Sequence, residues 1–175
     1  MKKYFIVIIL TAFASLTAQI NLVNIKMGHT YTVSVPDDMV KTYDFGNHQI
    51  LQYKNDANEI YLVILEESKD EFKARGIACN NAEDYYEIMT GDYKNNYLNY
   101  HEIKNETTQA NGNTIIQTEY EYTISDSTGQ ANLYFFQDYV DTGKYFYKVV
   151  FWTRSENTDL YRETATAISK TIKAD

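Results

Sequence analysis

The chain has 175 residues, with 24 acidic and 16 basic side chains and a formal net charge of −8. This length is typical of one domain with a hydrophobic core of its own. Because an acidic protein repels phosphate backbones and anionic lipids, the charge argues against nucleic-acid binding and against adsorption to a membrane surface. The only cysteine, Cys79, excludes an intramolecular disulfide and is expected to be a buried, inert thiol. A thiolate stabilised by a following helix is the alternative.

The first 18 residues have the layout of a secretory signal peptide. Lys2 and Lys3 form a positive start, residues 4–10 are an unbroken apolar run, and small or hydroxylated residues lead up to Ala18. The apolar run is shorter than the stretch of about 20 residues that a transmembrane helix needs. We therefore expect residues 1–18 to be a signal peptide that is removed during export.

Cleavage between Ala18 and Gln19 would leave residues 19–175 as a single α+β domain, because no Ser/Gly-rich linker divides this part of the chain. An exported lipoprotein needs a cysteine directly after its signal peptide, and this chain has Gln19 there. The expected product is a soluble protein, periplasmic or secreted, with no stable membrane anchor.

The first part of this domain reads as strands joined by turns. Residues 30–35 alternate in character and end at Pro36, which predicts a strand and a turn. Residues 48–54 and 59–66 flank a short Asn- and Asp-containing segment and predict a hairpin. Because residues 61–65 are apolar on both faces, this strand is expected to be covered on both sides.

Helices are expected next. Residues 68–75 predict a short helix, and Asn81 with Asp84 three residues later matches an N-terminal cap. Apolar and aromatic side chains then recur at helical spacing along one face: Tyr85, Ile88, Met89, Tyr93 and Tyr97. Gly91 costs a helix about 1 kcal/mol relative to alanine, so this helix is expected to be short or bent.

Three long strands follow, at residues 113–125, 130–139 and 144–154. In the first of them, apolar and aromatic residues alternate with polar ones, so the polar face is expected to lie in solvent. This polar face consists of Gln117, Glu119, Glu121 and Thr123. The third strand carries Lys148 as its one charge between residues 145 and 152, which predicts a central position in the sheet.

The last element is a helix that is expected to begin near Asn157 or Thr158. Its apolar residues recur at helical spacing: Leu160, Tyr161, Ala165, Ile168 and Ile172. This pattern predicts a helix that covers one face of the sheet. Together with the strands, it predicts an α+β fold, a mostly antiparallel β-sheet flanked by helices.

The sequence resembles PsbP/Mog1-like proteins across most of residues 20–175. The resemblance rests on the opening strand and proline turn at residues 31–38, the hairpin-rich middle, the aromatic strand ending at Trp152-Thr153-Arg154, and the closing helix. It implies an α/β/α sandwich and, for an exported bacterial member, a non-enzymatic accessory or binding role. It implies no site residue, because no site motif of the group has a match in this chain.

Motifs of catalysis and cofactor binding are missing from the sequence, so no catalytic residue, cofactor or metal ligand is expected. The segment His101-Glu102-Ile103-Lys104-Asn105 lacks the second histidine of an H-E-x-x-H zinc site and reads as a strand, with His101 in solvent. Asp138 is likewise expected to face water. The alternative is an exported metal-dependent or hydrolytic enzyme that uses His101 and Glu102 with His29 or His48.

The aromatic content suggests recognition, because 17 tyrosines and 8 phenylalanines exceed the usual needs of a core. Tyr134 and Phe136 share one strand face, whereas Leu133, Phe135 and Tyr139 share the other. If no helix covers one of these faces, its side chains would form a recognition surface, and we name Tyr134 and Phe136 as the candidates. The alternative is that both sets of side chains pack in the core of the protein.

The leading hypothesis is an exported, soluble, non-catalytic accessory or binding domain of the cell envelope. Its partner would be an unknown envelope protein or a small ligand. A third hypothesis is that the protein is a structural subunit of a larger assembly.

Overall fold

The computed structural model describes residues 21–27, 31–46, 51–126 and 129–174. The predicted signal peptide lies outside these ranges. Among the described residues, no helix is long and apolar enough to cross a lipid bilayer.

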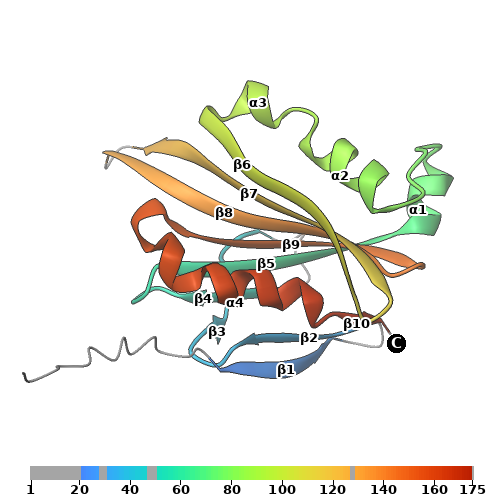
Figure 1. The fold of residues 1–175 in the computed structure, drawn as a ribbon, viewed down its shortest axis with the longest axis horizontal. Helices are drawn as coiled ribbons and strands as arrows, with labels where there is room; N and C mark the ends of the chain where they lie inside the picture. Colours follow the sequence, from blue (N-terminus) through green and yellow to red (C-terminus); the bar gives the residue numbers. More distant parts are fainter. Residues whose placement is uncertain (1–20, 28–30, 47–50, 127–128, 175) are drawn as a thin grey trace, which may run out of the picture.

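Within these ranges, the centre of the fold is a seven-stranded sheet in which each neighbouring pair is antiparallel (Figure 1). In spatial order its strands are β3 (Val40–Lys41), β4 (Leu51–Asn55), β5 (Ile60–Ser68), β9 (Tyr145–Arg154), β8 (Gly129–Asp141), β7 (Asn113–Asp126) and β6 (Leu98–Ala110). Strands β5 and β9 pair with each other in the interior of the sheet, as their two-sided apolar patterns predicted.

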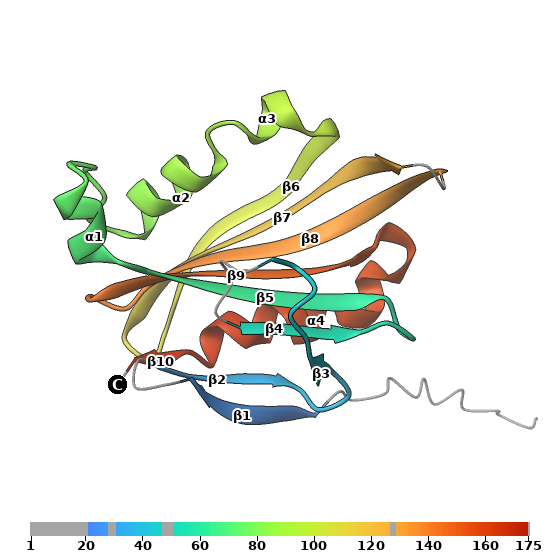
Figure 2. The same cartoon turned by 180° about the vertical axis from the view of Figure 1, so that it is seen from behind.

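One face of this sheet is covered by helix α4 (Thr158–Lys170) and by a second, small sheet (Figures 1 and 2). The small sheet consists, in the described part of the chain, of β1 (Leu22–Met27), β2 (Tyr31–Pro36) and β10 (Lys173–Ala174). The one-turn helix η1 (Ser155–Asn157) leads from β9 into α4. The buried side chains of β2, α4 and the large sheet form the main hydrophobic cluster. The sequence pattern did not indicate β1, β3 or β10.

The opposite face of the large sheet carries α1 (Lys69–Ala74), α2 (Ala82–Thr90) and α3 (Tyr93–Asn96) (Figure 1). Phe72 of α1 and Tyr85 of α2 pack on Phe146 of β9, with ring centroids 5.9 and 4.7 Å away. The layers therefore follow the α+β arrangement that the sequence predicted, an antiparallel sheet flanked by helices.

The helix boundaries on this face follow local signals. The Asn81 side chain accepts a hydrogen bond from the Asp84 N–H at 2.8 Å, which confirms the predicted cap of α2. Helix α2 ends at Thr90, directly before Gly91, and Tyr93 begins the separate short helix α3. The expected break at Gly91 is thus confirmed.

Cys79 lies just before α2 and belongs to the smaller hydrophobic cluster beneath the helices. Its side chain is buried, and this burial raises the pKa of the thiol to about 11. The expected burial of the thiol is confirmed, and the raised pKa disfavours the thiolate alternative.

The solvent-exposed polar face that was predicted for residues 113–125 is wrong. Gln117 is 3% exposed and Glu119 is 5% exposed, because α4 crosses the sheet directly over them. Helix α4 covers the sheet through Tyr161, Ala165 and Ile168, as expected, whereas Leu160 of the predicted apolar stripe is exposed. A polar strand face is buried here because α4 brings polar partners of its own.

Candidate recognition site

An aromatic ladder crosses four strands of the large sheet on the face opposite α4. Tyr61 of β5 pairs with Trp152 of β9, Trp152 with Phe135 of β8, and Phe135 with Tyr120 of β7. Directly paired residues point to the same side of a sheet, so the four rings form one row. Successive ring centroids lie 5.2, 6.1 and 5.2 Å apart, and each successive pair is stacked.

Helix α3 covers one end of this ladder. Its Tyr93 ring lies 5.7 Å from Tyr120, and Tyr97, the residue after α3, stacks on Tyr122 at 4.2 Å. The Tyr93 hydroxyl accepts a hydrogen bond from Lys148 Nζ at 2.6 Å and one from Gln137 Nε2 at 3.0 Å. These contacts attach α3 to β8 and β9, so the Tyr120 end of the ladder is closed.

The other end of the ladder meets the segment between β3 and β4. The Phe45 ring makes edge contacts with Trp152 at 5.1 Å and with Tyr61 at 5.8 Å. The buried amide of Gln52 holds this segment, because its Oε1 accepts from the Phe45 N–H at 3.0 Å and its Nε2 donates to the Gly46 carbonyl at 2.6 Å. Phe45 is therefore fixed in place by a side chain of β4 rather than by a helix or strand of its own.

A groove of about 550 Å³ lies at this end of the sheet, which α1–α3 leave uncovered. We name it the aromatic groove; it is lined by Phe45, Glu59, Tyr61, Ile124, Gly129, Gln130, Ala131, Leu133, Trp152 and Arg154. Its volume falls within the range of about 300–1,000 Å³ that is usual for small-molecule sites. Aromatic and aliphatic side chains contribute to its walls, but polar atoms make up the larger part of the exposed lining.

The charged groups of the groove belong to one ion pair. Arg154 Nε donates to Glu59 Oε1 at 2.7 Å, and this bond raises the pKa of the guanidinium. Burial, followed by the charges of Asp56 and Glu59, raises the pKa of Tyr61, which stays a neutral phenol. The positive charge of Arg154 and the negative charge of Glu59 therefore offset each other at the groove.

Glu59 is held in an unusual backbone conformation, with φ of 52°. A residue other than glycine in this left-handed region costs about 1–2 kcal/mol. Glu59 is the last residue of the turn between β4 and β5. Its side chain lines the groove and forms the ion pair with Arg154. Such local strain clusters at functional sites.

Tyr134 and Phe136, the residues predicted to form a recognition surface, lie on the opposite face of β8. They are 5% and 3% exposed and belong to the main core beneath α4. The Arg162 guanidinium of α4 lies over both rings, 5.4 and 5.7 Å from their centroids. Neither side chain is available as an exposed surface in this structure, because α4 covers them. Leu133, from the alternative set, does line the aromatic groove.

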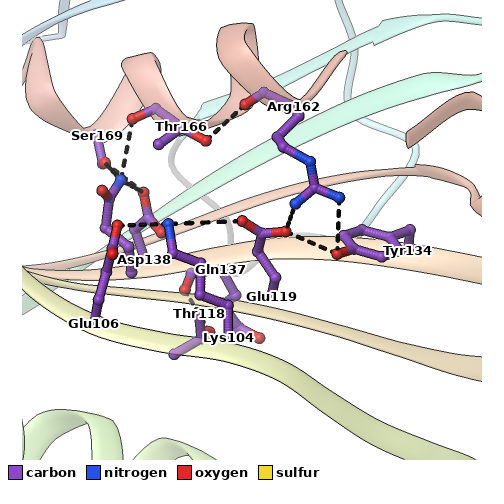
Figure 3. A network of polar contacts seen from close by, with 11 residues as sticks. Lys104, Glu106, Thr118, Glu119, Tyr134, Gln137, Asp138, Arg162, Thr166 and Ser169 are labelled. Carbon is purple, nitrogen blue, oxygen red and sulfur yellow. Dashed lines mark hydrogen bonds and ion pairs between the residues drawn. The ribbon is translucent and has the colours of Figure 1, made fainter. Parts of the chain in front are cut away.

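Polar contacts hold α4 on this buried face (Figure 3). The Glu119 carboxylate accepts hydrogen bonds from Arg162 and, at 2.7 Å, from the Tyr134 hydroxyl. The Asp138 carboxylate accepts from Ser169 and from Gln117 Nε2 at 2.9 Å. We name these two groups the helix-anchoring network. The network satisfies polar groups that would otherwise be buried without partners.

The expectation that Asp138 faces water is wrong. The side chain is buried under α4, and its burial raises the pKa of the carboxyl to about 6. Ser169 comes from the last turn of α4, far from Asp138 in sequence, so the pattern around Asp138 gave no sign of this partner.

The alternative enzyme hypothesis uses His101 and Glu102, which lie on β6, together with His29 or His48. His101 and Glu102 are exposed on this strand, and Glu102 accepts a hydrogen bond from the Tyr86 hydroxyl at 3.0 Å. His29 and His48 lie outside the described residues. In the part of the chain that the structure describes, no group of three or more His, Cys, Asp or Glu side chains is arranged to hold a metal ion.

Sequence reasoning missed the groove residues Phe45, Tyr61 and Trp152. A partial signal was present, since Phe135 and Trp152 occupy strands that a short turn joins, and hairpin register pairs them. No local signal connects Phe45 with Trp152, because the contact depends on the Gln52 side chain that positions the loop.

The sequence matches no protein-family profile, and no curated protein is similar to it in sequence. Solved structures do share its fold. The PsbP protein of Synechocystis sp. PCC 6803, CyanoP, matches with a TM-score of 0.61 and 11% identity, over 88% of this chain and 92% of its own. PA94 of Pseudomonas aeruginosa, a protein of unknown function, matches with a TM-score of 0.51 and 11% identity, over 86% and 94%.

LpqN of Mycobacterium tuberculosis, which is involved in cell envelope biogenesis, matches with a TM-score of 0.50 and 12% identity, over 89% of this chain and 91% of its own. At such identities the likeness concerns the fold alone. The PsbP/Mog1-like fold, which the sequence pattern resembled, is the fold of this chain.

Proposed function

We propose that this protein is an exported, non-catalytic accessory domain of the cell envelope that binds a ligand or partner in the aromatic groove. The observation that carries the proposal is the placement of the one tryptophan, Trp152, in the wall of a groove that none of the helices in the described part of the chain lines. The rest of the same sheet face is closed by α2 and α3, so the open end is a distinct feature.

The groove is built before any ligand arrives. Tyr61 and Trp152 are positioned by strands in the interior of the sheet, and the Gln52 amide fixes Phe45 against both rings. A site whose walls are already ordered loses little conformational entropy on binding. This rigidity supports recognition as the role of the groove.

The chemistry of the lining supports binding rather than catalysis. In the described part of the lining, the ionisable side chains are Glu59, Tyr61 and Arg154, and Glu59 and Arg154 form an ion pair. Among the described residues, the lining contains no serine, cysteine or histidine that could act as a nucleophile with a neighbouring base. A catalytic role for His101 and Glu102 would have to be performed elsewhere, on strand β6.

Export is supported by the charge and apolar pattern of residues 1–18. LpqN, which shares the fold, is involved in cell envelope biogenesis. An envelope location is consistent with both, and it would place the groove in contact with envelope molecules.

The fluorescence of Trp152 offers a direct test, since no other tryptophan contributes to the signal. Fractions of an envelope extract from the source organism would be titrated into the purified protein. We expect at least one fraction to shift the emission saturably, and the Tyr61→Ala and Phe45→Ala variants to lose that response. Tyr43→Ala is the matched control, because Tyr43 lies in the same loop as Phe45 but is 75% exposed and outside the groove.

Two outcomes would contradict the proposal. One is that no fraction changes the emission. The other is that the response is the same in the Tyr61→Ala and Phe45→Ala variants as in the unaltered protein.

A further inference from the structure

We propose that the aromatic groove binds a neutral saccharide, which rests on the proposed function of that groove as a binding site. The ligand class follows from three features of the lining: its aromatic walls, its free hydrogen-bonding groups and its compensated charge.

The aromatic walls suit the apolar side of a sugar ring. A pyranose presents C–H groups on one face, and these pack favourably against aromatic rings, whose faces carry partial negative charge. Tyr61 and Trp152 stack with an interplanar angle of 21°, and Phe45 meets both at a steep angle. Because Trp152 lies between Tyr61 and Phe135 in the ladder, these rings offer the groove apolar ring edges, beside the Phe45 ring, rather than one open aromatic face.

The polar groups of the lining suit hydroxyls. Among the described residues, the Arg154 side chain bonds only to Glu59, through Nε, which leaves its terminal nitrogens as donors. Tyr61 and Gln130 also line the groove, and the hydroxyl of the one and the amide of the other can both donate and accept. Hydroxyl groups are the ligand groups that satisfy such a mixed set, because each hydroxyl also both donates and accepts.

The charge of the groove favours a neutral ligand. Glu59 and Arg154, the two oppositely charged residues in the described lining, offset each other in an ion pair with 2.7 Å between Nε and Oε1. A carboxylate or phosphate at the terminal nitrogens of Arg154 would lie close to the Glu59 carboxylate, which repels it, and would also meet the net negative charge of the whole chain.

An extended peptide is less well matched. Peptides that bind a sheet usually add to an exposed strand edge through main-chain hydrogen bonds. The groove instead lies on the faces of β5, β9, β8 and β7, each of which pairs with a strand on both sides. The main-chain groups of these interior strands are occupied by the sheet, so a peptide would find few main-chain partners there.

The test uses cellotriose, maltotriose and chitotriose as neutral probes, trigalacturonate as an anionic probe, and a capped alanine–proline octapeptide as a peptide probe. Binding would be followed by Trp152 fluorescence and by calorimetry. We expect at least one neutral trisaccharide to bind saturably below about 10 mM, which corresponds to roughly 3 kcal/mol of binding free energy. Trigalacturonate and the octapeptide are expected not to bind in this range.

Variants distinguish hydroxyl recognition from simple apolar contact. Tyr61→Phe keeps the ring but removes the hydroxyl, and Gln130→Ala removes the amide. Each is expected to weaken trisaccharide binding by about three- to tenfold, as the loss of one hydrogen bond does. Tyr43→Phe is the matched control and should bind as the unaltered protein does.

The saccharide proposal is overturned if no neutral trisaccharide binds, if the octapeptide alone binds, or if Tyr61→Phe and Gln130→Ala both bind with unchanged affinity. If an envelope fraction still gives a response that depends on Tyr61 and Phe45, the groove is a binding site for another ligand. If neither the trisaccharides nor any fraction gives a response, the proposed function fails as well.

Discussion

Trp152 and Tyr61 occupy paired positions on β9 and β5, and their rings stack with centroids 5.2 Å apart. The pair extends the aromatic ladder of the sheet to a place that α1–α3 do not reach, where both rings line the aromatic groove. Phe45 completes this corner from a loop, so its position depends on the side chain that holds the loop.

Replacement of Gln52 by alanine is expected to loosen the loop that carries Phe45. The Gln52→Ala variant loses the hydrogen bonds to the Phe45 N–H and the Gly46 carbonyl. We expect the free energy of unfolding to fall by about 1–3 kcal/mol and the Trp152 emission to shift to longer wavelength. Urea denaturation and fluorescence spectra would measure the two effects. Gln109→Ala, at an exposed position of β6, is the control and should leave both unchanged.

Two arginine variants are expected to differ in their effect on stability. Arg162→Ala leaves the buried Glu119 carboxylate without its partner on α4, so we expect a loss of about 2–4 kcal/mol. Arg154→Ala breaks a pair whose two side chains are 43% and 40% exposed, so we expect a loss below about 1 kcal/mol. Chemical denaturation of both variants under the same conditions measures the difference. Equal losses would show that the helix-anchoring network does not stabilise α4 on the sheet.

Asp138 is expected to make stability depend on pH. Burial raises the pKa of Asp138 to about 6 in the folded protein, whereas an exposed aspartate has a pKa of about 4. Between these values the folded state holds a proton that the unfolded state has released, so the contribution of Asp138 is fully present below about pH 4. It falls as pH rises to about 6, by roughly 2–3 kcal/mol.

The Asp138→Asn variant removes this titration while keeping an oxygen that can accept from Ser169. We therefore expect the unaltered protein to lose stability relative to the variant as pH rises from about 4 to 6, and the difference to stay constant above that range. Urea denaturation of both proteins across this pH range provides the measurement. A constant difference throughout would contradict the prediction.

Export is expected to depend on residues 1–18. The full chain, expressed in a bacterial host, should give a processed product whose first residue is Gln19, as read by N-terminal sequencing of the exported fraction. A chain that lacks residues 2–18 should stay in the cytoplasm. Export of the shortened chain, or an exported product that still begins at Met1, would show that this segment is not a cleaved signal peptide.

Local signals in the sequence were sufficient for most helices and strands. The Asn81 cap and Gly91 delimit α2 through interactions within a few residues, and the hairpin between β4 and β5 depends on the short turn that joins them. The apolar runs of β5 and β9 indicated interior strands because burial on both faces requires apolar residues at every position. These features need no knowledge of distant residues.

The faces of the strands could not be assigned in the same way. Gln117 and Glu119 alternate with apolar residues as they would on a solvent-exposed strand, and the sequence pattern of a polar face is the same whether water or a polar helix surface covers it. Arg162 and Ser169 provide that cover, and both come from a helix that follows two further strands. For the same reason the sequence did not indicate that α4 covers Tyr134 and Phe136, which belong to the main hydrophobic cluster.

The sequence by itself determined the α+β class, the order of the main elements and the amphipathic closing helix. These features depend on the conformational preferences of nearby residues and on the spacing of hydrophobic residues along the chain. Only the tertiary structure decided which aromatic residues are buried and which line a groove. The physical reason is that strand pairing brings Tyr61, Trp152 and Phe135 together across the sheet, while the placement of α1–α4 determines which rings stay uncovered.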